Sequence, residues 1–169
     1  MGRAELILVF GAIAIFGIFS LSILDMQIRT RISNVNRKYE DAAVSLAHSY
    51  LNMAGNEKFD ERVNSDNKLP SGVNFSPIDS LGTESGEINP ANYNDLDDYM
   101  DLTDDTLVVD IGGENIFHFT VNCTVYYVTH NGTEWVGSGS VSDNKKIEFR
   151  LNSDYLPSEA NFSRVISYR

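Results

Sequence analysis

The first 54 residues combine an unbroken apolar run with a periodic one. No charged residue occurs from Leu6 to Leu24, and a helix needs about 20 apolar residues to cross a bilayer. After Asp25, apolar residues recur at steps of three and four, which is typical of one face of a helix. They are Ile28, Ile32, Val35, Tyr39, Ala42, Leu46, Tyr50 and Met53. The pattern predicts one helix of about 54 residues, roughly 80 Å long, that ends at Gly55-Asn56.

Residues 1–24 form the apolar half of this helix and residues 25–54 its amphipathic half. An apolar stripe on a polar helix must be covered by another element. We therefore expect it to pack on the remainder of the chain. The residues that we expect in this contact are Ile32, Val35, Tyr39, Leu46 and Tyr50.

Residues 55–169 have the pattern of one globular head, with a loop-rich part over 55–106 and a sheet over 107–169. The predicted strands are Leu107–Ile111, Ile116–Thr129, a short return strand from Glu134, Lys145–Leu151 and Phe162–Tyr168. In the longest strand, one face should meet the helix and carries Phe117, Phe119, Val121, Cys123, Val125 and Tyr127. The expected fold class is α+β, one long helix packed on an antiparallel sheet of about four strands.

One acid stands beside the apolar run. Glu5 directly precedes Leu6, and a carboxylate in apolar surroundings is costly unless it is paired. A signal anchor has Lys or Arg before its apolar core and does not need an acid there. One explanation is that Glu5 lies at the membrane surface and pairs with Arg3.

Glu5, the run Leu6–Leu24 and the stripe that follows resemble the mature N-terminus of type IV pilins and type II secretion pseudopilins. In that family a prepilin peptidase removes a short leader and leaves an acid at the fifth position of the helix. Glu5 matches this acid if Met1 is the processed first residue. Many bacterial pilins carry a proline near the end of the apolar run, where this chain has Leu21-Ser22-Ile23.

The resemblance implies a structural subunit and not an enzyme. It would be methylated, would polymerise with copies of itself, and would pair Glu5 with the α-amino group of Met1 on a neighbour. Its helix core would contain Leu6, Phe10, Gly11, Phe16 and Gly17. The subunit would lie in the inner membrane with the assembly machinery and the peptidase, and then in a filament outside the cell. The alternatives are a minor pilin or pseudopilin, and a singly anchored extracytoplasmic binding domain that does not polymerise.

The composition adds two constraints on the head. The formal net charge is −11, with most acids beyond the helix, which disfavours nucleic-acid binding by the head. Cys123 is the single cysteine, so no internal disulfide can close the head. Cys123 lies on the inward strand face, where we expect a small core residue and not a nucleophile.

The most unusual local composition is the acidic segment from Asn94 to Asp105, with six aspartates. The sequence favours a solvated turn and helix cap, anchored by Leu96, Tyr99 and Leu102. A Ca²⁺ cage of carboxylates is the weaker alternative, because the spacing is not that of an EF-hand loop. Its ligands would be Asp95, Asp97, Asp98 and Asp101.

No catalytic motif is evident in the sequence. His48, His118 and His130 have no metal-ligand spacing, and neither a nucleophile elbow nor a phosphate-binding loop is present. We expect no catalytic residue and no cofactor. Three Asn-x-Ser/Thr triplets are candidates for N-glycosylation, at Asn122, Asn131 and Asn161.

Overall fold

The structure is a computed structural model of the 169-residue chain. It describes residues 2–64, 66, 68–87, 89–102, 105–111 and 115–168. For residues 101, 105–111 and 115–117 it describes the backbone alone. The chain divides into two units, Met1–Tyr39 and Glu40–Arg169.

The long helix is present as predicted. Helix α1 runs from Arg3 to Ala54 without a break, and Gly55 follows its last residue. Gly55 closes the helix because its N–H donates to the carbonyl oxygen of Leu51 at 3.0 Å. A Cβ at Gly55 would also stand 2.7 Å from a guanidinium nitrogen of Arg164, so that side chain lies close to the end of the helix. The apolar first part makes α1 long and apolar enough to cross a membrane.

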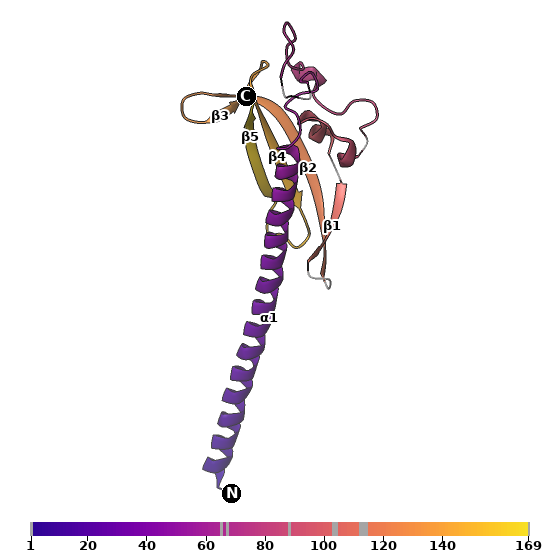
Figure 1. The fold of residues 1–169 in the computed structure, drawn as a ribbon. Helices are drawn as coiled ribbons and strands as arrows, with labels where there is room; N and C mark the ends of the chain where they lie inside the picture. Colours follow the sequence, from indigo (N-terminus) through magenta and orange to yellow (C-terminus); the bar gives the residue numbers. More distant parts are fainter. Residues whose placement is uncertain are drawn as a thin grey trace. The chain divides into compact units, whose positions relative to one another are not determined.

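The second unit holds an antiparallel sheet (Figure 1). Its path is β1-β2-β4-β5, and the short β3 pairs with the far end of β2. The strands are β1 Asp105–Ile111, β2 Asn115–His130, β3 Trp135–Gly137, β4 Asn144–Asn152 and β5 Ala160–Ser167. All four predicted long strands are therefore confirmed, and the fold class is α+β.

The inward face of the sheet follows the predicted alternation. Phe119, Val121, Cys123, Val125 and Tyr127 of β2 are all buried, whereas His118 on the other face is exposed. The side chain of Phe117, the first residue predicted on this face, lies outside the described residues. On β4 the buried residues are Lys145, Ile147, Phe149 and Leu151.

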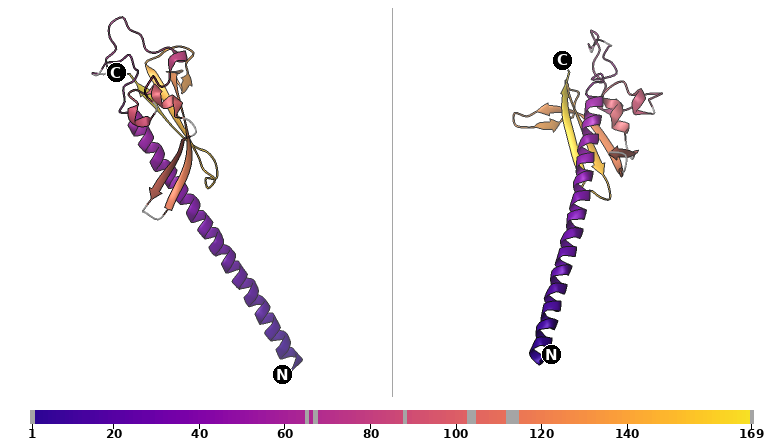
Figure 2. Two further views of the ribbon diagram at one scale, coloured as in Figure 1. Left: turned by 90° about the vertical axis from the view of Figure 1, so that its right-hand side faces the viewer. Right: turned by 60° about the horizontal axis from the view of Figure 1, so that its bottom comes forward.

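The last turns of α1, residues 40–54, lie along this face of the sheet in each view (Figure 2). The ring of Tyr50 packs against that of Phe149 at a tilt of 37°, with centroids 5.2 Å apart. Four alanines in these turns are fully buried, as small residues of a closely packed helix face are. They are Ala42, Ala43, Ala47 and Ala54.

The predicted packing residues of the helix have different surroundings. Tyr39 and Tyr50 are buried, and Leu46 is partly buried. Ile32 and Val35, which belong to the first unit, are 56% and 42% exposed, and their packing on the head stays a prediction. The apolar period of the sequence continues N-terminal to Tyr39, but burial along the helix begins only at Tyr39.

The connection from α1 to the sheet is irregular, as predicted, and contains three short 3₁₀ helices. These are η1 Ile78–Ser80, η2 Pro90–Asn92 and η3 Asp97–Asp101. The connection returns to the head core through Phe59, Val63 and Phe75, which are buried against Tyr127. This cluster holds the connection against β2 and so determines where its polar residues lie.

Candidate assembly surface and buried charge network

The first half of α1 presents apolar side chains to its surroundings. Every Leu, Ile, Val and Phe of residues 6–24 is exposed, from 42% at Ile23 to 75% at Leu8. Leu6, Phe10 and Phe16, predicted in the helix core of an assembly, belong to this set. At Gly11 and Gly17 no heavy atom lies within 4 Å of an added Cβ. A continuous apolar surface of this kind marks a membrane or protein contact.

Glu5 lies at the start of this helix and caps it. Its Oε2 accepts a hydrogen bond from the backbone N–H of Gly2 at 2.9 Å. A carboxylate in the first turn is also favoured by the partial positive charge of the helix N-terminus. Among the described residues no ion pair joins Glu5 to Arg3, and Met1, the other predicted partner, lies outside them.

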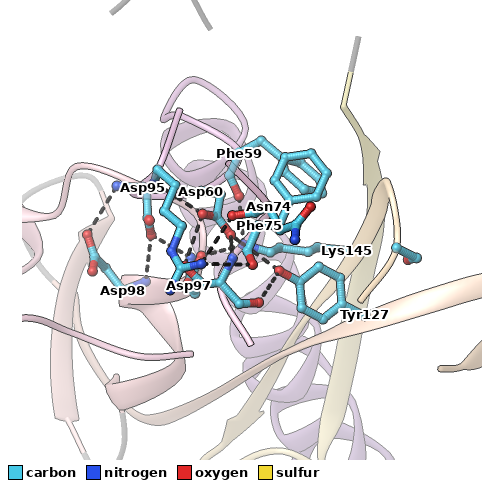
Figure 3. A network of polar contacts seen from close by, with 12 residues as sticks. Phe59, Asp60, Asn74, Phe75, Asp95, Asp97, Asp98, Tyr127 and Lys145 are labelled. Atoms are coloured by element: carbon cyan, nitrogen blue, oxygen red, sulfur yellow. Dashed lines mark hydrogen bonds and ion pairs between the residues drawn. The ribbon is translucent and has the colours of Figure 1, made fainter. Parts of the chain in front are cut away.

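The head contains a buried charge network centred on Lys145 (Figure 3). The Lys145 side chain is fully buried, and its ammonium donates three hydrogen bonds. The acceptors are the carbonyl oxygen of Phe59 at 2.8 Å, Asp60 Oδ2 at 3.0 Å and Asp97 Oδ1 at 2.5 Å. The ammonium also lies 4.9 Å from the Phe59 ring centroid and 5.2 Å from that of Tyr127. All three N–H groups of the cation are thus satisfied.

Asp60 has further partners that hold it as an anion. Its carboxylate accepts from the N–H and the hydroxyl of Ser76 at 2.9 and 3.0 Å, and from the N–H of Arg62 at 3.1 Å. The Tyr127 hydroxyl lies 3.2 Å from Asp60 Oδ2 and donates to the carbonyl oxygen of Ser76 at 2.8 Å. Burial alone would raise the pKa of Asp60, but the charge of Lys145 and these donors lower it.

Two pairings bring the network together. Lys145 on β4 stands opposite Tyr127 on β2 in the antiparallel register. In the connection, Lys58 and Asp95 form a parallel bridge, and the N–H of Leu96 donates to the carbonyl oxygen of Lys58 at 2.9 Å. The segment that carries Asp60 and the segment that carries Asp97 are therefore paired side by side above the end of β4.

Asp95 is the acid next to this network. Its Oδ1 accepts from the N–H groups of Asp97 and Asp98 at 2.9 and 3.3 Å, which closes the first turn of η3. Burial, together with the negative charges of Asp97 and Asp98, raises the pKa of Asp95 to about 8. At neutral pH Asp95 is thus largely protonated, and Asp60 and Asp97 are the two carboxylates that pair with Lys145.

The prediction for the acidic segment is confirmed in its anchors and wrong in its exposure. Leu96, Tyr99 and Leu102 are each 1% exposed, as expected of anchors. A solvated turn was predicted, but Asp95, Asp97 and Asp98 are also buried, because Lys145 and backbone N–H groups replace the water. The side chain of Asp101 lies outside the described set.

Asp97 faces Lys145, whereas Asp98 accepts hydrogen bonds from the N–H groups of Asn94 and Asp95, at 2.7 and 3.1 Å. Asp97 therefore pairs with a side-chain cation, whereas Asp98 accepts hydrogen bonds from the backbone.

The other candidate residues, namely the cysteine, the histidines and the asparagines of the Asn-x-Ser/Thr triplets, lie apart from one another. Cys123 is buried on the inward face of β2, and burial raises the pKa of its thiol. The three histidines, His48, His118 and His130, are exposed. Of the glycosylation candidates, Asn131 and Asn161 are exposed and Asn122 is partly buried.

Comparison with protein-family models, with curated proteins and with solved structures gave no match for this chain. The long N-terminal helix and the small antiparallel sheet are compatible with a pilin-like fold.

Lys145 was not among the functional residues predicted from the sequence. The signal was present, because Lys145 shares its strand parity with the inward residues Ile147, Phe149 and Leu151. A lysine on the apolar face of a predicted strand needs a buried anion. The acidic segment was the nearest candidate in composition, and Asp97 of that segment is one of its two carboxylate partners.

We predict that Lys145→Met destabilises the head by about 3–5 kcal/mol, because it leaves Asp60 and Asp97 buried without a cation. Lys146→Met is the matched control. Lys146 is the next residue along β4, and its ion pair with Glu148 is partly exposed, at 3.6 Å. A pair of that kind contributes at most about 1 kcal/mol. Urea unfolding of both variants measures the difference, and equal losses of stability would contradict the role of the network.

We also predict that Asp95→Asn changes the pH dependence of stability. The folded chain holds the Asp95 proton up to about pH 8, whereas the unfolded chain releases it near 3.8. Wild-type stability therefore falls as pH rises through this window, because the unfolded state binds fewer protons. The Asn side chain is neutral like the protonated acid and does not titrate. The variant therefore lacks the contribution of Asp95 to the pH dependence of stability. Urea unfolding in metal-free buffer at pH 5, 6.5 and 8 should show the variant gaining on the wild type with pH; a constant difference would contradict the assignment.

Proposed function

We propose that the protein is a structural subunit of an extracellular type IV pilus-like filament, which polymerises through its N-terminal helix. The observation that carries this proposal is the exposed apolar surface of residues 6–24, on a helix that continues without interruption to Ala54 in the head. The resemblance of Glu5 and the apolar run to mature pilins supports it. The head fold is compatible with this family.

The same apolar surface would be covered in two successive environments. Before assembly, lipid would surround residues 6–24, which are long and apolar enough to span a membrane. In the filament, helices of neighbouring subunits would replace the lipid. Small residues at a helix surface allow close helix–helix approach, and Gly11 and Gly17 offer open positions for such contacts. The partners are thus further copies of the chain, the membrane, the prepilin peptidase and the assembly machinery of the inner membrane.

Glu5 would set the position of each subunit along the filament. An α-amino group has an ordinary pKa of about 7.7–8.0 and is cationic at neutral pH. Its attraction to a carboxylate increases when both are removed from water. In the single chain Glu5 accepts only a backbone hydrogen bond from Gly2 among the described residues. The Met1 amine of a neighbour would supply the missing positive charge, with Arg3 as the competing partner.

The head would form the outer surface of the filament. The chain carries a net charge of −11, and acids outnumber bases by 24 to 13, so the heads repel nucleic acid and other acidic surfaces. With Cys123 as the single cysteine, no internal disulfide stabilises the head. The Lys145 network and the pairing of β5 with β4 would stabilise it instead.

Two alternatives share the same helix. A minor pilin or pseudopilin would use the same contacts in a shorter or mixed assembly. A singly anchored binding domain would keep residues 6–24 in lipid and form no fibre. Fibre formation by the purified protein separates the anchored domain from the two assembling classes.

We predict that Phe16→Arg abolishes fibres. Phe16 is 71% exposed in the single chain, and an unpaired guanidinium in a packed helical core costs several kcal/mol per subunit. Phe16→Leu is the matched control and should assemble normally. Electron microscopy of sheared fibres gives the yield, and the membrane fraction reports insertion. Normal fibre yield from Phe16→Arg would show that this residue lies outside the filament core.

We predict that Glu5→Gln and Glu5→Ala insert into the membrane but form few or no fibres. Gln keeps the length and the hydrogen-bonding capacity of Glu5 and removes only its charge, so it isolates the electrostatic contribution. Fibre yield and membrane fractions are measured side by side for both variants. Fibres at the wild-type level from both substitutions would exclude a role for Glu5 in assembly.

A further inference from the structure

Three carboxylates of the irregular connection meet at one point, away from Lys145. One oxygen each of Glu84, Glu87 and Asp98 lie within 4.8 Å of one another. Glu84 is exposed, Glu87 partly buried and Asp98 buried. None of the ion pairs found among the described residues involves these three acids. Their mutual repulsion is therefore not offset by a basic side chain.

A second observation points to a missing partner. Asp98 is 0% exposed, and its Oδ1 has no hydrogen-bond partner, whereas its Oδ2 accepts from the N–H groups of Asn94 and Asp95. A buried carboxylate oxygen without a donor is costly. The side-chain Oδ1 of Asn94 is likewise buried and without a partner, while its amide nitrogen donates to Glu87.

We propose that Glu84, Glu87 and Asp98 bind a Ca²⁺ ion, with Asn94 Oδ1 as a further ligand. All four supply oxygen, the donor that hard cations prefer. Calcium bonds oxygen at about 2.3–2.6 Å, so two of its ligands stand at most about 5 Å apart. The 4.8 Å that limits the spacing of the three carboxylates fits one shared ion. Of the four acids that the sequence suggested as calcium ligands, only Asp98 belongs to this set.

The geometry favours calcium over magnesium. Mg²⁺ requires a near-octahedral shell at about 2.0–2.1 Å, whereas Ca²⁺ accepts six to eight oxygens in irregular arrangements. The ligands come from two separate segments, residues 84–87 and 94–98, and Glu84 at the exposed side leaves the remaining positions to water. Such an irregular and partly open set is typical of calcium.

The ion would join the loop to the head core. Asp98 lies in η3, next to Asp97, which binds Lys145 on β4 (Figure 3). Glu84 and Glu87 lie in the loop between η1 and η2. Calcium would thus attach this loop to the segment that covers the buried lysine. The site is independent of filament formation, so its test stands apart from the tests above.

The experiment uses the full chain in detergent, freed of metal with EDTA and dialysed. Titration with CaCl₂ should show one ion per chain by calorimetry, with a dissociation constant of about 10⁻⁴–10⁻³ M, as in extracellular modules. The melting temperature should rise with CaCl₂, and MgCl₂ at the same concentration should have a much smaller effect. No heat of binding, or an equal rise with NaCl of matched ionic strength, would overturn the proposal.

Two variants locate the ion. Glu84→Gln and Glu87→Gln should each weaken calcium binding at least tenfold while the protein still folds, since both side chains reach solvent. Glu159→Gln removes the same charge from an exposed position outside the cluster and is the matched control. Its calcium affinity should equal that of the wild type. Unchanged affinity in both cluster variants, or an equal loss in the control, would overturn the site.

Discussion

The apolar first half of α1 is the feature on which the proposed function depends. Residues 6–24 expose large apolar side chains along the helix, and the free energy of leaving such a surface in water is large. In the proposed function, lipid and then the helices of other copies cover this surface. Because the helix continues to Ala54 without a break, whatever covers the apolar half also anchors the head.

A second constraint acts inside the head. A fully buried ion pair contributes little net stability when compared with apolar residues of similar volume, but loss of one partner leaves an uncompensated buried charge. Lys145 therefore favours the one arrangement in which Asp60 and Asp97 both reach it. These acids come from two parts of a long irregular connection, so loss of Lys145 would leave both parts with an unpaired buried carboxylate.

The elements of regular structure could be predicted from the sequence because each has a period. The apolar run and the stripe predicted one helix that ends at Gly55. The alternation of apolar residues from Phe119 to Tyr127 predicted the inward face of β2. The stripe also includes Ile32 and Val35, which are exposed in the single chain, because periodicity shows that a face is apolar but not which partner covers it.

The charge network could not be predicted in the same way. Composition made the acidic segment conspicuous, but burial of Asp95, Asp97 and Asp98 depends on Lys145, which lies far along the chain. The meeting of Glu84 and Glu87 with Asp98 likewise depends on how the connection folds back.

Cryo-electron microscopy of the purified wild-type protein is the decisive experiment for the proposed filament. We expect helical fibres with residues 6–24 in the core and the heads outside. Detergent-bound single chains that never form fibres would contradict the proposed function.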